Sequence, residues 1–127
     1  MVSPLVVLLP PTEADEDEAA YYRERLEDLS LMEAALTVRV GGVAYLAVPV
    51  GGARRGGYLP MPELAMGCAV RDALRGTPGF PDVRLRWSPY EDACHVVAWG
   101  ERAPEDDELQ GRFYGYSAEA ITQALAR

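Results

Sequence analysis

The sequence predicts an α+β fold, with an antiparallel sheet built from two β-hairpins and helices packed mainly on one face. The first hairpin is indicated by two β-branched stretches on either side of Gly41 and Gly42, a loop length and composition that favour a primed turn. The second is indicated by residues 83–87, where apolar residues alternate with arginines, followed by the apolar stretch 94–99. Stretches with helical spacing of apolar residues precede, separate and follow the hairpins.

The two-residue turn also fixes the register of the first hairpin. The expected pairs are Val40 with Val43, Val38 with Tyr45, Leu36 with Ala47 and Arg39 with Ala44. The first strand should be half exposed. The second strand, residues 43–48, is apolar at every position, which favours a strand covered on both faces or placed centrally with helices above it. Pro49 should end it, because proline cannot donate to the ladder.

In the second hairpin the apolar residues of the first strand, Trp87 included, should face the core, as should Trp99 in the partner strand. If Trp87 pairs with Cys94, then His95 lies on the arginine side of the sheet. Residues 89–92 form the connecting loop.

Four stretches carry helix signals, each with a cap or boundary residue. These residues are Thr12, Ser30 with Glu33 for a short helix over residues 31–36, Pro62 with Gly76, and Ser117. The helix after Pro62 should be central, with most of its side chains buried on the sheet. Its exposed stripe should consist of Glu63, Gly67, Arg71 and Arg75.

A chain of 127 residues is large enough for one domain with a hydrophobic core, so residues 1–127 are interpreted as a single domain. Its acidic segment 1–18 and acidic loop 100–111 are expected to be mobile. The apolar run 5–9 is a doubtful strand; if it is a true strand, a ferredoxin-like arrangement fits the order of elements. Residues 51–62 are interpreted as a glycine-rich loop.

The formal net charge of −8 opposes direct attraction to nucleic acids and anionic membranes, and it allows a basic partner. Prolines surround the apolar run near the N-terminus and no basic residue precedes it, which is not the pattern of a signal peptide or a membrane span. Cys68 and Cys94 lack CxxC spacing and are interpreted as buried, reduced thiols. We therefore expect a cytoplasmic protein.

Arg54 and Arg55, between paired glycines, are candidates for holding an anion such as a phosphate or carboxylate. The spacing matches neither a P-loop nor a dinucleotide fingerprint. The alternative is a flexible loop whose arginines pair with the protein's own acids. His95 is the single histidine and has no evident base or orienting partner, so we assign no catalytic residue, metal site or cofactor.

Arg112, Phe113, Tyr114 and Tyr116 form a compact aromatic segment that could also add a short strand, and such residues are enriched at protein interfaces. The alternative is that Phe113 and one tyrosine close the core while the others cover it. The acidic clusters 13–18 and 105–108 could together imitate a phosphate backbone, although runs of charge are usually solvated.

Three phrases, VPVGGARRGGYLP, GFPDVRLRW with CHVVAWG, and GRFYGYS, resemble a family of small, uncharacterised actinobacterial proteins known as a domain of unknown function. The resemblance spans most of the chain from about Tyr21 onward. It implies a bacterial cytoplasmic setting and no activity, cofactor or catalytic residue.

The leading hypothesis is a small protein-binding or regulatory module without catalysis, of unknown oligomeric state, that contacts a protein partner through Arg54, Arg55 and residues 112–116. One alternative is a small-anion or nucleotide-binding enzyme that uses the two arginines. A second alternative is an acidic nucleic-acid mimic that inhibits a nucleic-acid-binding protein.

Overall fold

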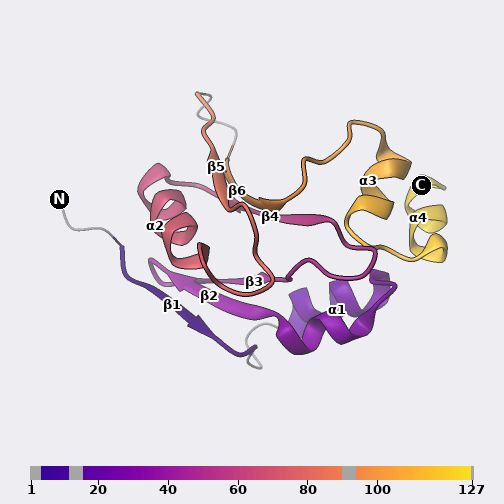
Figure 1. The fold of residues 1–127 in the computed structure, drawn as a ribbon, viewed down its shortest axis with the longest axis horizontal. Coiled ribbons are helices and arrows are strands. Elements are labelled where there is room, and N and C mark those ends of the chain that lie inside the picture. The colour runs from indigo at the N-terminus through magenta and orange to yellow at the C-terminus, as the bar shows by residue number, and fades with distance from the viewer. Residues whose placement is uncertain (1–3, 12–15, 90–93, 127) are drawn as a thin grey trace.

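The computed structural model describes residues 4–11, 16–89 and 94–126, and holds two antiparallel three-stranded sheets with helices packed against them (Figure 1). The α+β class predicted from the sequence is confirmed. In chain order the elements are β1 (Val6–Leu9), α1 (Glu16–Arg25), η2 (Leu29–Ala34), β2 (Leu36–Val40), β3 (Val43–Ala47), β4 (Gly56–Met61), α2 (Leu64–Leu74), β5 (Arg84–Arg86), β6 (His95–Gly100), α3 (Asp107–Phe113) and α4 (Ala118–Leu125).

The first sheet has the strand order β1-β2-β3, and the predicted register of its hairpin is confirmed at all four pairs. Gly41 and Gly42 both have positive φ, as a primed turn requires. The doubtful run near the N-terminus is a strand, β1, paired antiparallel with β2. The two hairpins nevertheless lie in separate sheets, so the single sheet of a ferredoxin-like fold does not form.

The second sheet has the order β4-β6-β5, and β4 lies where the sequence predicted only a loop. The glycines that suggested a loop serve close packing instead. A Cβ atom on Gly56 would lie 2.6 Å from the Phe113 ring, and one on Gly57 would lie 2.6 Å from both the Trp99 ring and the Arg54 guanidinium. These two positions of the strand therefore need residues without a side chain.

The predicted register of the second hairpin is wrong by one residue. Arg86 pairs with Val96 and Leu85 with Val97, so His95 lies on the side of Leu85 and not on the arginine side. Trp87, predicted to be buried, is 61% exposed because β5 ends at Arg86. Part of the predicted loop, residues 90–92, lies outside the described residues.

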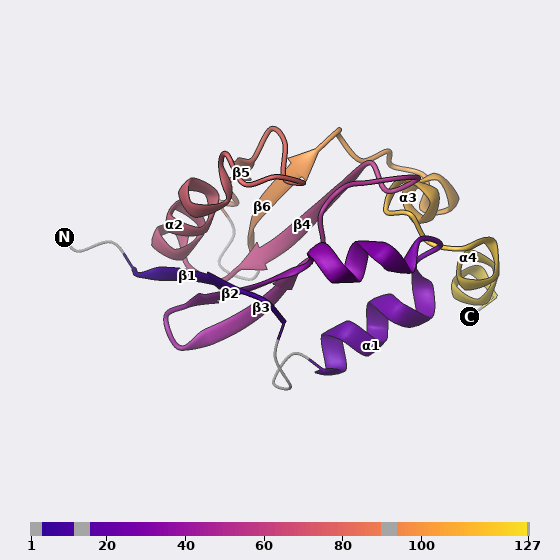
Figure 2. The same cartoon turned by 60° about the horizontal axis from the view of Figure 1, so that its bottom comes forward.

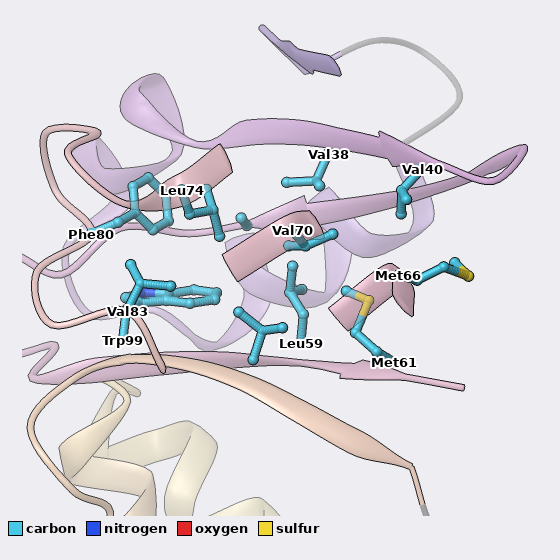
Figure 3. Close-up of a cluster of buried hydrophobic side chains, with 12 residues drawn as sticks. Val38, Val40, Leu59, Met61, Met66, Val70, Leu74, Phe80, Val83 and Trp99 are labelled. Atoms are coloured by element: carbon cyan, nitrogen blue, oxygen red, sulfur yellow. The ribbon is translucent and has the colours of Figure 1, made fainter. Parts of the chain in front are cut away.

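Helix α2 lies between the two sheets and forms the main core with them (Figure 3). Val70 and Leu74 are fully buried against valines of β2 and against Leu59 and Trp99 of the second sheet. Gly67, predicted to lie on the exposed stripe of this helix, is buried close to the Leu85 side chain. Glu63 occupies the N-cap position of the helix. The helix ends at Leu74, shortly before Gly76, which has positive φ.

The opposite face of the first sheet packs on α1 and η2, which lie away from α2 (Figure 2). Leu46 and Val48 face these helices, whereas Ala47 faces the main core, so this strand is covered on both faces towards its end, as predicted. Its first residue, Val43, is 44% exposed. Helices thus cover both faces of the first sheet.

Several predicted helix ends need correction. Asp28 caps η2 by accepting a hydrogen bond from the Ser30 amide, so Ser30 is not the cap. Asp106 caps α3, which occupies much of the predicted loop 100–111 and also replaces the start of the predicted strand at Arg112. Ser117 caps α4 as predicted. Thr12 lies outside the described residues.

Candidate functional site

Three chain segments that are distant in sequence are joined by backbone hydrogen bonds beside the second sheet. The Arg55 amide donates to the Phe113 carbonyl at 2.7 Å, and the Glu27 amide donates to the Gly115 carbonyl at 2.8 Å. Residues 51–54 form a tight turn closed by two backbone hydrogen bonds between Gly51 and Arg54. The arginine pair is therefore held in a fixed conformation between the two sheets and the C-terminal helices.

Arg54 is at the centre of this junction and is only 3% exposed. Its Nη1 donates to the Tyr114 carbonyl at 3.0 Å, and its Nε and Nη2 donate to the Val48 carbonyl at 3.4 and 3.3 Å. The indole Nε1 of Trp99 donates to the same Val48 carbonyl at 3.2 Å. The buried Val48 carbonyl oxygen therefore binds both Arg54, in the segment that connects the two sheets, and Trp99, the largest side chain of the core.

The charge of Arg54 is compensated without an acidic partner among the described residues. Its guanidinium carbon lies 5.5 Å from the ring centroid of Tyr22 and 5.9 Å from that of Tyr114, within the range of cation–π attraction. Burial lowers the pKa of Arg54, and the electrostatic influence of the Tyr22 and Tyr116 side chains opposes that change. Carbonyl dipoles and tyrosine rings thus replace the water that this cation has lost.

The other basic candidates, Arg55 and Arg112, lie on the surface and are paired with acids, and for Arg55 this is the pairing that the alternative to anion binding predicted. Arg55 pairs with Glu101 at 3.3 Å, and Arg112 pairs with Glu108 at 3.0 Å. Of the candidates named from the sequence, the structure brings together Arg54, Tyr114 and Tyr116, which line one cavity.

That cavity has a volume of about 480 Å³. Six tyrosines line it: Tyr21, Tyr22, Tyr45, Tyr58, Tyr114 and Tyr116. A second cavity of about 830 Å³ lies over the outer face of the second sheet, and a third of about 310 Å³ lies against α4. Tyr58 and Tyr114 line all three. We call these three neighbouring cavities, which share Tyr58 and Tyr114 in their lining, the tyrosine groove.

Strand β4 provides part of the floor of the groove. Leu59 and Met61 point into the core and are buried, whereas Tyr58 and Pro60 alternate with them and are exposed. The Tyr58 and Tyr114 ring centroids lie 5.6 Å apart, and those of Tyr114 and Tyr116 lie 6.2 Å apart. Phe113 supports this row by packing edge-on against Tyr114, with centroids 5.0 Å apart.

Burial favours the neutral form of three phenols in the groove. It raises the pKa of Tyr22, Tyr114 and Tyr116 above the ordinary value of 10.0. In Tyr116 a hydrogen bond to the Tyr21 side chain acts in the same direction. These rings therefore offer hydroxyl groups and apolar faces to an occupant, and no negative charge.

Sequence reasoning missed four of the six tyrosines: Tyr21, Tyr22, Tyr45 and Tyr58. Tyr58 was detectable, because Tyr58 and Pro60 alternate with Leu59 and Met61 as in a half-buried strand. The preceding glycines obscured that pattern. The contributions of α1 and β3 depend on how the helix docks on the sheet, for which no local signal exists.

The remaining chemical candidates lie elsewhere. The Nδ1 atom of His95 accepts a hydrogen bond from the Ser88 amide at 3.0 Å. Cys68 and Cys94 are free, but Cys68 is half-buried and Cys94 is exposed, so the prediction of buried thiols is wrong. Within the described ranges, no group of three His, Cys, Asp or Glu side chains could hold a metal ion.

Residues 8–127 match a family of unknown function, DUF6302, and the chain belongs to this family. The unknown-function family implied by the sequence resemblance is thereby confirmed. No curated protein and no solved structure gives a significant match. Across the described residues, none of the helices has the length and apolar character needed to span a membrane.

Replacing Arg54 with alanine should lower the free energy of unfolding by about 3 kcal/mol, because the Tyr114 carbonyl loses a donor and a buried void opens. Arg55→Ala is the matched control, since it removes only an exposed ion pair and should leave the melting temperature almost unchanged. Urea unfolding of both variants measures the difference. Equal, small effects would contradict the structural role of Arg54.

Stability should also fall at alkaline pH. Unfolded phenols lose protons at about pH 10, whereas the buried tyrosines have a raised pKa and keep theirs, so the unfolded state binds fewer protons above that pH. The contribution of these phenols to the free energy of unfolding should be constant below their unfolded pKa and decline as pH rises above 10. Unfolding curves across this range, with tyrosinate absorbance recorded in parallel, measure it. Ionisation of all tyrosines near pH 10 in the folded protein would refute it.

Proposed function

We propose that this protein is a protein-binding module without catalysis, and that it holds an extended segment of a partner in the tyrosine groove. The observation that carries the proposal is that Tyr58 and Tyr114 line all three cavities, so that each cavity offers the same two aromatic rings to an occupant. Tyr58 is 48% exposed and Tyr21 is 45% exposed, which leaves large aromatic surfaces available for contact.

The spacing of the rings suits an extended occupant. Alternate side chains of an extended segment lie roughly 6.6 Å apart on one face. The separations of 5.6 Å between Tyr58 and Tyr114 and of 6.2 Å between Tyr114 and Tyr116 are close to that repeat. Successive side chains on one face of a partner segment could therefore contact successive rings.

The proposal excludes catalysis because the groove lacks a paired nucleophile and base among the described residues. Its ionisable lining beside the tyrosines consists of carboxylates and guanidinium groups, and His95 is engaged with the Ser88 amide outside it. Positioned acid–base or nucleophilic chemistry needs such a pair within hydrogen-bonding distance.

Binding of a small anion is the second candidate, and a specific observation favours it. Arg54 lines the 480 Å³ cavity and has no acidic partner among the described residues. An anion in the cavity would neutralise that charge. The candidate is weaker because each guanidinium nitrogen already has an acceptor, and because Arg55 pairs with Glu101 outside this cavity.

The nucleic-acid mimic has less support, because described acids of both clusters make local contacts. Glu16 pairs with Arg23, Asp106 caps α3 and Glu108 pairs with Arg112. The actinobacterial origin and the cytoplasmic location rest on the sequence resemblance and on the composition.

A display library of random linear peptides, selected on the immobilised protein, tests the proposal. The selected peptides should bind Tyr58→Ala about tenfold more weakly than the wild type, a loss of about 1.4 kcal/mol. Trp87→Ala is the matched control, because Trp87 is also an exposed aromatic residue but lies outside the groove. The proposal fails if no peptide is enriched, or if Tyr58→Ala binds the selected peptides as tightly as the wild type.

A further inference from the structure

Two exposed residues of opposite charge line different cavities of the tyrosine groove. Asp17 lines the 480 Å³ cavity, and Arg86 lines the 830 Å³ cavity, which shares Tyr58 and Tyr114 with the first. Both side chains belong to exposed residues, and neither forms an ion pair within the described part of the chain. The two cavities therefore present charges of opposite sign to an occupant that contacts both.

Arg86 differs from the nearby Arg84 in the contacts that its side chain makes. Arg84, two residues earlier on the same face of β5, donates to the carbonyls of Gly100 and Glu101 and pairs with Asp82. Arg86 makes no such contact within the described residues. Together with the larger effect of Arg54, its charge opposes the rise in the pKa of Tyr114 that burial causes. The field of Arg86 thus reaches the aromatic centre of the groove.

Three arginines and two glutamates line the large cavity: Arg84, Arg86, Arg102, Glu101 and Glu105. Arg84 pairs with Asp82, and Glu101 pairs with Arg55. Arg102 and Glu105 have opposite charges and add no net charge to the lining, which leaves the positive charge of Arg86 on the sheet.

At the opposite end, Asp17 is the acid that remains available. Glu18 also lines the cavity, but its carboxylate accepts a hydrogen bond from the Leu46 amide at 2.6 Å. Glu16, one residue before Asp17, pairs with Arg23 at 2.8 Å. The chain thus commits two of three successive acids to its own structure and leaves the middle one facing the cavity.

We propose that the occupant of the tyrosine groove is an extended segment of a partner protein that carries an acidic residue at the Arg86 end and a basic residue at the Asp17 end. This inference rests on the proposed function and adds the charge and the direction of the segment. Exposed charges contribute mainly to specificity and orientation, whereas the central tyrosines contribute most of the affinity. The charge pattern therefore selects the partner and fixes which way its chain runs.

The test is a charge exchange. Peptides selected on the wild type should contain an acidic residue whose replacement by lysine weakens binding about threefold to fivefold, as expected for one exposed ion pair. Selection on Arg86→Glu should instead enrich lysine or arginine at that place, and the preference between the matched acidic and lysine peptides should reverse. High salt should reduce both preferences. Asp17→Asn should remove the preference for a basic residue at the other end.

Arg39→Glu is the matched control, because Arg39 is an exposed arginine on β2 that lines none of the three cavities, and this variant should keep the wild-type preference. If Arg86→Glu selects the same peptides with the same acidic residue, the charge pattern is wrong while the binding function stands. If Arg39→Glu reverses the preference equally, the effect reflects net charge and the inference fails. If no peptide is enriched on any variant, the proposed function fails and this inference fails with it.

Discussion

The structure depends on one buried carbonyl oxygen, that of Val48. It accepts hydrogen bonds from the Arg54 guanidinium and from the Trp99 indole, directly after the last strand of the first sheet. Arg54 in turn donates to Tyr114, beyond the end of α3. Both sheets and the C-terminal helices therefore meet at a single network. Buried networks of this kind stabilise a fold only when every member is satisfied, and no described buried side-chain nitrogen or oxygen lacks a partner here.

The same network shapes the groove. Arg54 lies beneath the rings of Tyr22 and Tyr114, so a residue that holds the sheets together also fixes two tyrosines of the lining. Tyrosines have few rotatable bonds, and those held by packing lose little conformational freedom when a ligand binds. A pre-organised aromatic surface can therefore bind an extended segment whose own ordering is costly.

The sequence correctly predicted the features that depend on local residue patterns. Two glycines with positive φ specified the first turn and its register, and Ser117 specified the start of α4. It failed where tertiary packing decided. Gly56 and Gly57 signalled a loop but lie in β4, because the rings of Phe113 and Trp99 occupy the space of their absent side chains.

The candidate site was predictable only in part for the same reason. Tyr114 and Tyr116 were identified from their compact aromatic segment, and both line the groove. Arg54 was identified as a residue that could contact an anion, yet its burial follows from contacts across long sequence separations that no local pattern encodes. Arg86 was interpreted only as part of an alternating strand, and its position in the large cavity depends on how α3 and the loop before it lie over the second sheet.

The central claim is that Arg54 is a structural cation that holds the groove, and not a ligand-binding one. Side-chain NMR of the arginine Nε–H groups, recorded in chloride and again with inorganic phosphate, tests it most directly. The account predicts that the Arg54 Nε–H exchanges slowly with water, because it is buried and hydrogen-bonded, and that phosphate does not shift its resonance. Fast exchange, together with a shift that saturates as phosphate is added, would show instead that this arginine binds an anion.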